Sequence, residues 1–335
     1  MVKLTAEAIQ QQFKEYFNRQ RTRVFHRDDV DHIRLTDETI FAIVDALWPW
    51  RILGDSVDLL ARAFQVFRTH AMKSGEGQFL TPHRIIRPCV AALDITPLDK
   101  IIDPAGGTGG FVIEALRQVQ ERYFPNESDT WRLVKFANDN VYSVELDPLG
   151  TKLTKAMMIA MQDGSTHTLT GDAIRIHLWK SQFPELQREL GDPRKDGEVA
   201  EQFTVVLTNP PFGKDLKVSA ADARASGYTI TQAAAGTKRG KSHVALEIGL
   251  VYLELAHRLL QVGGRVGIIL PETYFFSHKY RWLPAWLEGR FALRGMLNIP
   301  MEAFEEFCRA KTNFYIFEKI GHGPKDMAMR EGEES

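Results

Sequence analysis

From about residue 97 onward, short runs rich in β-branched and aromatic residues alternate with longer segments whose apolar residues recur every three or four positions. This alternation is typical of a doubly wound parallel sheet, in which helices connect successive strands. We expect seven strands, at residues 100–103, 141–145, 167–171, 203–208, 265–270, 292–299 and 312–319. We expect helices at residues 109–122, 148–162, 243–262 and 278–288. The predicted fold is therefore an α/β, Rossmann-like, doubly wound sheet of seven strands.

The segments outside this alternation divide the chain into parts. Residues 1–75 have a helical pattern without a clear strand, which predicts a small N-terminal helical appendage. The sheet domain is expected at residues 76–320, and the polar residues 321–335 are expected to form a disordered tail. Residues 180–202 read as a polar insertion, and residues 213–242 have little hydrophobic periodicity. We expect the second segment to lack regular structure, and such a long loop in a compact domain is usually functional or disordered.

The composition excludes several classes of function. Hydrophobic residues at 44% and charged residues at 25% describe an ordinary globular protein. No run approaches the ~20 apolar residues of a membrane span, and the N-terminus lacks the apolar core of a signal peptide, so we expect a cytoplasmic location. Cys89 and Cys308 are too few for a disulfide framework, and the ten histidines lack metal-ligand spacing, so no metal is expected. A net charge of -1 does not fit a protein that binds nucleic acid unaided.

A glycine-rich turn, "DPAGGTGGF" at residues 103–111, follows the first predicted strand. Glycine permits close backbone approach, and the helix that follows presents unpaired amide hydrogens to a ligand. The dinucleotide fingerprint needs a sixth-place glycine, but Val112 stands there when counting starts at Gly107, and no "GxxxxGK" is present. A ligand without phosphates therefore fits better, the alternative being a merely tight turn between strand and helix.

Acidic residues follow the second and third predicted strands, in "VELDP" and "GDAI". Glu145 is expected to accept hydrogen bonds from a ribose diol, because the strand period points it toward the ligand crevice. Asp147 is expected to cap the next helix instead. Asp172 is a candidate to receive the amino group of an adenine ring, although its motif alone is a weak signal.

The fourth strand ends in "TNPPFG", residues 208–213. Two consecutive prolines cannot continue a strand, because neither has an amide hydrogen and each fixes its own φ. The result is a rigid turn that carries an amide side chain at one end and an aromatic ring at the other.

These four motifs, in this order at successive strand ends, resemble those of class I S-adenosylmethionine-dependent amino-methyltransferases. The chain is most similar to the modification subunit of type I restriction-modification systems, as "GQFLTP" at 77–82, "GGRVGIILPE" at 263–272 and "KTNFYIFEK" at 311–319 also indicate. The resemblance covers about residues 55–319, so that 76–320 is expected to be the methyltransferase domain. The motif "NPPF" alone also occurs in methyltransferases that act on ribosomal RNA guanine or on protein glutamine.

The resemblance implies S-adenosyl-L-methionine as cofactor and the N6 amino group of a flipped-out adenine in double-stranded DNA as target. A separate specificity subunit and a restriction subunit are the expected protein partners. The implied catalytic residues are Asn209, Pro210, Pro211 and Phe212. The implied cofactor-binding residues are Phe79, Thr81, Pro82, Asp103, Ala105, Gly106, Gly107, Thr108, Gly109, Glu145, Asp172, Ala173 and Asn209.

The chemistry expected of the fourth motif follows from the electronic structure of an exocyclic amine, whose lone pair is delocalised into the ring. Acceptors on Asn209 and on the Pro210 carbonyl draw the two amino hydrogens and favour a more tetrahedral, nucleophilic nitrogen. Two prolines keep these acceptors rigid, and catalysis benefits from such preorganisation. Phe212 offers a stacking face for a base rotated out of the duplex.

Several features depart from the family pattern or leave alternatives open. Gly106 stands where many relatives carry a bulkier small residue, and no segment is long enough for a target recognition domain, which predicts a trimmed or compact variant. An RNA or protein-glutamine methyltransferase, a cytosine amino-methyltransferase and a scaffold without cofactor remain alternatives. The segment between Gly213 and His243 carries a net charge of +4 and is expected to order over the DNA backbone. Its six basic and two acidic residues are Lys214, Lys217, Arg224, Lys238, Arg239, Lys241, Asp215 and Asp222.

Overall fold

A computed structural model describes residues 11, 15, 36–47, 81–161, 165–195, 197–211, 213, 216–236, 242–304 and 311–323. The chain divides into two compact units, Met1–Val66 and Phe67–Ser335. In the first unit the described residues include the helix α2 (Asp37–Leu47). The rest of the predicted helical region, and most of the predicted tail, lie outside the described residues, so the predicted boundaries of both remain predictions.

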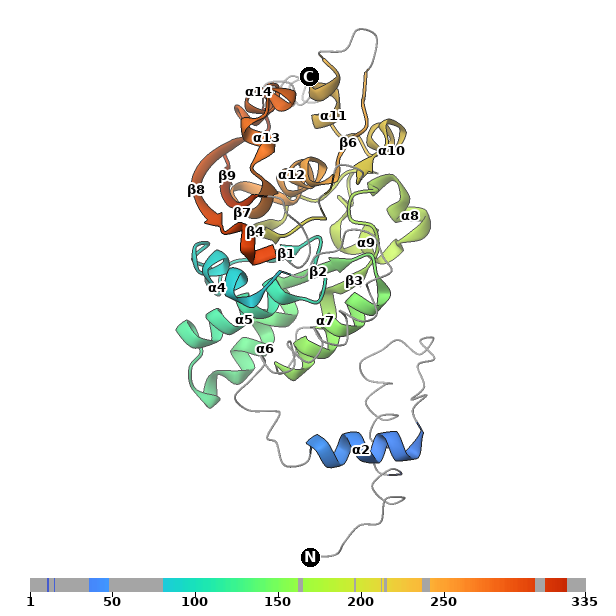
Figure 1. Ribbon diagram of the computed structural model, residues 1–335, viewed down its shortest axis with the longest axis vertical. Coiled ribbons are helices and arrows are strands. Elements are labelled where there is room, and N and C mark those ends of the chain that lie inside the picture. Colours follow the sequence, from blue (N-terminus) through green and yellow to red (C-terminus); the bar gives the residue numbers. More distant parts are fainter. Residues whose placement is uncertain are drawn as a thin grey trace, which may run out of the picture. The chain divides into compact units, whose positions relative to one another are not determined.

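The second unit is built on a seven-stranded sheet, as the alternating pattern predicted (Figure 1). Its strand order is β3-β2-β1-β4-β7-β9-β8, in which β9 runs antiparallel between β7 and β8 and the other neighbours are parallel. The strands are β1 (Ile101–Asp103), β2 (Val141–Glu145), β3 (Thr168–Thr170), β4 (Phe203–Thr208), β7 (Leu260–Pro271), β8 (Phe291–Ile299) and β9 (Thr312–Lys319). The predicted α/β, doubly wound fold is confirmed.

Helices cover both faces of the sheet, because its central strands are apolar on both sides. In Figure 1, α4, α5, α6 and α7 lie on one side and α12 on the other. On the first side, Phe111 of α5 stacks on Phe314 of β9, with ring centroids 6.5 Å apart. On the second, Ile102, Val206 and other strand residues pack with α12 in one buried cluster. In the described part of the second unit, the helices longer than six residues are α4 (His83–Ala91), α5 (Gly110–Tyr123), α6 (Thr130–Asn140), α7 (Pro148–Ala160), α9 (Pro184–Leu190) and α12 (Ile248–Leu259).

Two predicted helices are shorter or more broken than expected. The helix predicted at 243–262 begins only at Ile248, because Leu246–Glu247 pair as strand β6 with β5 (Lys217–Val218). It ends at Leu259, because Leu260 already belongs to β7. The helix predicted at 278–288 is replaced by short elements. These are the 3-10 turn η4 (His278–Tyr280) and α14 (Leu283–Leu287), and the short helix α13 (Thr273–Phe276) precedes them.

The two insertions are folded where the structure describes them, which corrects the expectation that the second lacks regular structure. The first contains α9, and α8 (Trp179–Gln182) starts just before it; Trp179 and Leu186 are fully buried. The second contains β5, α10 (Ala220–Ala225) and α11 (Ile230–Ala235). Tyr228 and Ile230 have no exposed surface, so the part of the second insertion at residues 216–236 packs into the core. Its basic cluster at 237–241 lies outside the described residues.

Candidate active site

The carboxyl ends of β1, β2, β3 and β4 meet at one edge of the sheet and border a cavity of about 430 Å³. Ligands in open α/β sheets bind at this edge. Twelve predicted site residues line the cavity: Thr81, Asp103, Ala105, Gly106, Gly107, Thr108, Glu145, Asp172, Ala173, Asn209, Pro210 and Pro211. Pro82 and Gly109 instead precede α4 and α5 as N-cap residues. Phe79 and Phe212 lie outside the described residues.

The glycine-rich turn after β1 fits tightly against β2. The amide of Gly106 donates to the Val144 carbonyl at 2.8 Å, and a Cβ built on Gly106 would lie 2.1 Å from Ser143 Oγ. Gly109 has φ +80°, in the left-handed region that favours glycine, and α5 begins directly after it. The backbone of this turn therefore reaches the cavity wall, because its glycines have no side chains to intervene.

Glu145, at the end of β2, is a buried carboxylate that organises this turn. Its Oε2 accepts the amide hydrogen of Gly107 at 2.7 Å, and its Oε1 accepts that of Asp147 at 2.9 Å. Its exposed fraction is 8%. The predicted cap is confirmed, since Asp147 Oδ1 accepts the amide of Leu149 at the start of α7. Asp147 thus takes the predicted capping role, and the ribose contact of Glu145 stays a prediction.

Asp103, at the end of β1, is almost fully buried beside Glu145. Its Oδ1 accepts the amide hydrogen of Ala105 at 3.0 Å. Burial raises the pKa of the Asp103 carboxyl to about 7, because desolvation of the charged form outweighs this hydrogen bond. A cationic ligand group at this carboxyl would favour its ionised form.

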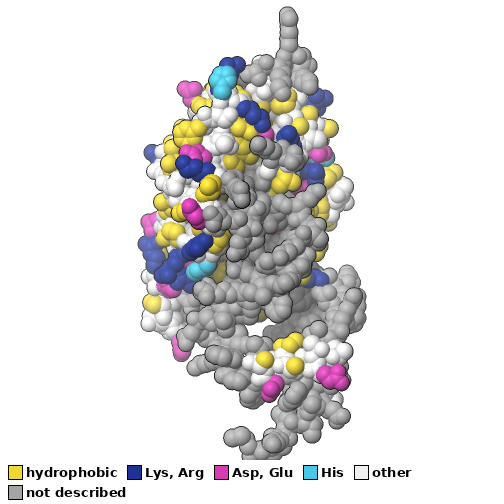
Figure 2. All heavy atoms as spheres, in the orientation of Figure 1, with side chains coloured by type: hydrophobic (Ala, Val, Ile, Leu, Met, Phe, Trp, Pro, Cys, Tyr) yellow, Lys and Arg dark blue, Asp and Glu magenta, His cyan; other side chains and the backbone are white. Residues whose placement is uncertain are grey.

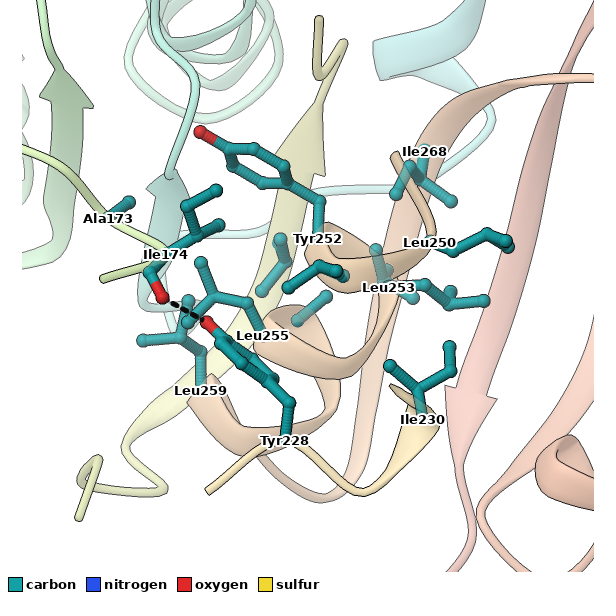
Figure 3. Packing of buried hydrophobic residues seen from close by; sticks show 14 of the residues in the cluster. Ala173, Ile174, Tyr228, Ile230, Leu250, Tyr252, Leu253, Leu255, Leu259 and Ile268 are labelled. Atoms are coloured by element: carbon teal, nitrogen blue, oxygen red, sulfur yellow. Dashed lines mark hydrogen bonds between the residues drawn. The ribbon is translucent and has the colours of Figure 1, made fainter. Parts of the chain in front are cut away.

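Asp172, after β3, is held from several directions. Its Oδ1 accepts the amides of Ile174 and Arg175, and its Oδ2 accepts Arg175 Nη1 at 2.7 Å. Its backbone carbonyl accepts Trp179 Nε1 at 2.8 Å. The carbonyl of Ile174 accepts the Tyr228 hydroxyl at 2.8 Å (Figure 3). The loop that carries Asp172 is therefore anchored independently of any ligand.

The proline turn after β4 places the Asn209 amide in the cavity wall. Its Nδ2 donates to Thr81 Oγ1 at 2.8 Å. Its Oδ1 is buried and has no hydrogen-bond partner within the described part of the chain. Buried polar atoms are nearly always hydrogen-bonded, so an acceptor left open beside a cavity indicates a place for a ligand donor.

Sequence reasoning missed several residues of the cavity wall. Leu146 is 54% exposed and follows Glu145 directly, so its position in "VELDP" was a usable signal. Tyr252 of α12, seen in Figure 3, also lines the cavity. Its hydroxyl donates toward the Pro104 carbonyl at 3.5 Å. The sequence around Tyr252 has the pattern of a buried helix, so nothing in it distinguished this tyrosine from an ordinary core residue. Arg175 also lines the cavity wall, and its side chain donates toward Asp222, which lies 47 positions later in the sequence.

Within the described ranges, no group of three or more His, Cys, Asp or Glu side chains is placed to hold a metal ion. Among the same residues, no helix combines the length and the apolar character that a membrane crossing requires.

Comparison with known proteins decides the family. The sequence profile described as N-6 DNA Methylase matches residues 53–328. This chain belongs to the N-6 DNA methylase family. The motif-based resemblance to amino-methyltransferases and to type I modification subunits is thereby confirmed.

The individual relatives of this chain include methylase subunits of type I restriction enzymes. The methylase subunit of the type I restriction enzyme EcoKI from Escherichia coli (strain K12) is 29% identical over 249 residues, covering 74% of this chain and 41% of that subunit. The chain thus spans about two fifths of the length of this curated relative.

Two solved structures show the same fold. A modification subunit attributed to a type I restriction enzyme of Vibrio vulnificus YJ016 has a TM-score of 0.58 at 22% identity, covering 84% of this chain and 53% of that one. A Listeria monocytogenes protein assigned to the class I S-adenosylmethionine-dependent methyltransferases has a TM-score of 0.56 at 14% identity, covering 96% and 83%.

Proposed function

We propose that this chain carries the catalytic site of a site-specific DNA adenine methyltransferase, which transfers a methyl group from S-adenosylmethionine to the N6 amino group of a flipped-out adenine. The observation that carries the proposal is the Asn209 amide, whose Nδ2 is engaged by Thr81 and whose buried Oδ1 has no partner among the described residues. An amino hydrogen of a target base is a donor of the kind that this oxygen needs. Membership of the N-6 DNA methylase family supports the same chemistry.

The cavity fits the proposed cofactor by the chemistry of its side chains. Three carboxylates line it, those of Asp103, Glu145 and Asp172, and all three are buried. Such a set of acceptors suits a ligand that brings an ammonium group, a ribose diol and an adenine amino group, and it disfavours phosphates. We assign the ammonium to Asp103, the diol to Glu145 and the adenine amino group to Asp172. When bound, the cofactor supplies an electrophilic methyl group on its sulfonium.

The chain's own residues act on the target amine. Asn209 Oδ1 accepts one amino hydrogen and the Pro210 carbonyl accepts the other, which localises the lone pair on nitrogen and makes it nucleophilic without a strong base. Pro210 and Pro211 fix φ at both positions, so the acceptors need no reorganisation during the reaction. Phe212 follows directly and is assigned as a stacking face for the base.

We further propose that recognition of the DNA sequence comes from a partner. The net charge of -1 supplies little attraction to phosphates, and the EcoKI relative is one subunit of a restriction enzyme. By this likeness the chain works in the cytoplasm as a modification subunit, with a separate specificity subunit and a restriction subunit as partners.

Two measurements test the proposal in order. Calorimetry with S-adenosylmethionine comes first, using Glu145→Gln as the variant, because one amide oxygen cannot serve the amide hydrogens of both Gly107 and Asp147. We expect the wild type to bind and the variant to bind roughly ten- to hundredfold more weakly. Failure of the folded wild type to bind would refute the cofactor assignment and favour the scaffold alternative.

The second measurement uses labelled cofactor with DNA, ribosomal RNA and protein as acceptors, with and without a specificity subunit. We expect N6-methyladenine in DNA digests, at defined sites only when the specificity subunit is present. Label in RNA or in glutamine side chains, or N4-methylcytosine in DNA, would replace the proposed substrate by one of the alternatives.

A further inference from the structure

Arg175 bridges two carboxylates at the edge of the cavity. Its Nη1 donates to Asp172 Oδ2 at 2.7 Å, and its Nε donates toward Asp222 Oδ2 at 3.4 Å. The Arg175 side chain is 40% exposed, whereas Asp172 is 8% and Asp222 30% exposed. A planar guanidinium presents donors in a rigid fork and can hold two carboxylates at once, which a lysine ammonium on a flexible stem does poorly.

The two carboxylates belong to different parts of the site. Asp172 follows β3 and is assigned to the adenine of the cofactor. Asp222 lies in α10, within the segment that follows the catalytic proline turn. That segment touches the same loop a second time, because the Tyr228 hydroxyl donates to the Ile174 carbonyl deep in the core (Figure 3). The loop at 172–175 is thus fastened at two points to the chain that leaves the catalytic turn.

We propose that Arg175 is a positioning residue for the cofactor's adenine, and that its bridge to Asp222 couples the adenine subsite to α10. This inference rests on the proposed function of the cavity. Two backbone amides already occupy Asp172 Oδ1, so Oδ2 is the oxygen assigned to the adenine amino group. The hydrogen bond from Arg175 holds the Asp172 side chain in one rotamer. Oδ2 keeps a further lone pair for the adenine amino group.

Coupling of this kind is reciprocal. A displacement of α10, such as one caused by substrate binding at the proline turn, weakens the hydrogen bond from Arg175 to Asp172. It therefore lowers the affinity of the site for adenine. Conversely, an adenine bound at Asp172 stabilises the bridge and therefore the position of α10. His177 reinforces this helix, since its Nδ1 lies 2.8 Å from Ser226 Oγ, directly after α10.

The experiment compares two nucleoside probes on the full chain. S-adenosylhomocysteine has the amino group, whereas S-inosylhomocysteine has a carbonyl oxygen in its place, so their affinity ratio reports on the contact at Asp172. The variants are Arg175→Met, Asp222→Ala and the double variant. Arg122→Met is the matched control, because Arg122 pairs with Asp94 at 2.7 Å and does not line the cavity. Binding is measured by calorimetry and folding by thermal unfolding.

We expect Arg175→Met to lower the affinity for S-adenosylhomocysteine about tenfold and the affinity for S-inosylhomocysteine less than about twofold. The selectivity for the adenosyl probe over the inosyl probe therefore falls. Asp222→Ala should weaken the adenosyl probe about threefold, and the double variant should be no weaker than Arg175→Met alone. Arg122→Met should bind as the wild type does. Unchanged selectivity in a folded Arg175→Met variant, or full additivity in the double variant, would overturn the coupling. A folded wild type that binds neither probe would instead overturn the proposed function and this inference with it.

Discussion

Asn209 Nδ2 donates a hydrogen bond to Thr81 Oγ1 at 2.8 Å, joining residues that are 128 positions apart in sequence. The bond fixes the orientation of the amide, because a nitrogen that is bound to Thr81 leaves the oxygen for another partner. Thr81 precedes α4, so a residue in front of this helix sets the direction of the Asn209 Oδ1 that we propose as the catalytic acceptor. Thr81 therefore orients Asn209, in addition to lining the cavity wall.

Replacing Thr81 with valine keeps the side-chain shape and removes the hydrogen bond. We expect turnover to fall roughly five- to tenfold, since one neutral hydrogen bond contributes about 1 kcal/mol. Single-turnover methylation with saturating cofactor measures the effect. Thr166→Val is the matched control, because Thr166 also bonds an asparagine, at 2.7 Å from Asn138 Oδ1, on an exposed surface. Equal turnover in Thr81→Val and wild type would contradict an orienting role.

Asn209→Ala removes the acceptor itself. We expect cofactor affinity to stay within about twofold while turnover falls by about two orders of magnitude or more, as for other preorganised contacts made in a transition state. Calorimetry and single-turnover rates separate the two quantities. A folded variant that methylates at the normal rate would refute the role assigned to this amide.

Much of the sheet was predictable because its buried strands read as continuous apolar runs. The bounds 141–145, 203–208 and 312–319 coincide with β2, β4 and β9. The helix α6 was missed, since only Leu133, Phe136 and Ala137 of its residues are buried and its apolar stripe is narrow. The folded part of the segment after the proline turn was also missed, because small alanines and isolated larger residues such as Val218, Tyr228 and Ile230 fill its share of the core without a periodic apolar stripe.

The acidic residues of the candidate site were predictable for a topological reason. Carboxyl ends of neighbouring parallel strands meet at one edge, so residues that end β1 and β2 or closely follow β3 had to lie close together. Arg175 and Tyr252 were not predictable in this way. Arg175 is positioned by its contact with Asp222, 47 positions away in sequence, and Tyr252 is positioned by the packing of α12 on the sheet.

The packing of Ser143 against the turn explains why position 106 of this chain requires glycine. Gly106→Ala would place Cβ 2.1 Å from Ser143 Oγ and 3.4 Å from Ser143 Cβ. We expect the single variant to lose roughly 1 to 3 kcal/mol of stability through overpacking. Adding Ser143→Ala removes the clashing oxygen and should restore most of the loss. Chemical denaturation measures both, and a double variant no more stable than Gly106→Ala would show that the clash lies elsewhere.

Asp103 predicts a pH dependence of stability. Burial raises the pKa of its carboxyl to about 7, whereas an unfolded aspartate titrates near ~3.9. Between these values the folded chain binds more protons than the unfolded chain, so stability falls as pH rises, by on the order of 1 kcal/mol per pH unit. Asp103→Asn lacks this titration. We expect wild type without cofactor to lose more stability than Asp103→Asn between pH 5 and pH 7, and parallel profiles would contradict the assignment.

The same titration predicts that wild-type affinity for S-adenosylmethionine rises from pH 5 to pH 7, where an α-amino group of ordinary pKa, about 7.7 to 8.0, is still protonated and its ammonium prefers the ionised carboxyl. Calorimetry across this range, with Asp103→Asn as the control, separates the effect from any other group. An affinity that does not change with pH in either protein would show that Asp103 does not bind the cofactor's ammonium.

The basic residues after the proline turn are expected to contact DNA phosphates. Lys238, Arg239 and Lys241 fall in the sequence between α11 and β6, and Leu216, Lys217 and Val218 earlier in the same segment line the cavity. In a complex with a specificity subunit, we expect the triple alanine variant to bind DNA more weakly and to flatten the slope of log affinity against log salt. Each lost phosphate contact changes that slope by about 0.9, so the largest expected change is about 3. Sequence preference should be unchanged, because phosphate contacts position a protein without reading bases.

A charge-matched control comes from another surface. Figure 2 shows Lys and Arg side chains gathered over α4 and α5, and the exposed Arg87, Arg122 and Arg132 of α4, α5 and α6 do not line the cavity. Their triple alanine variant removes the same net charge. If the effect comes from contacts beside the catalytic turn, the control should change the salt slope by less than about 1. Equal changes in both variants would assign the effect to net charge alone and would contradict a local role for residues 237–241.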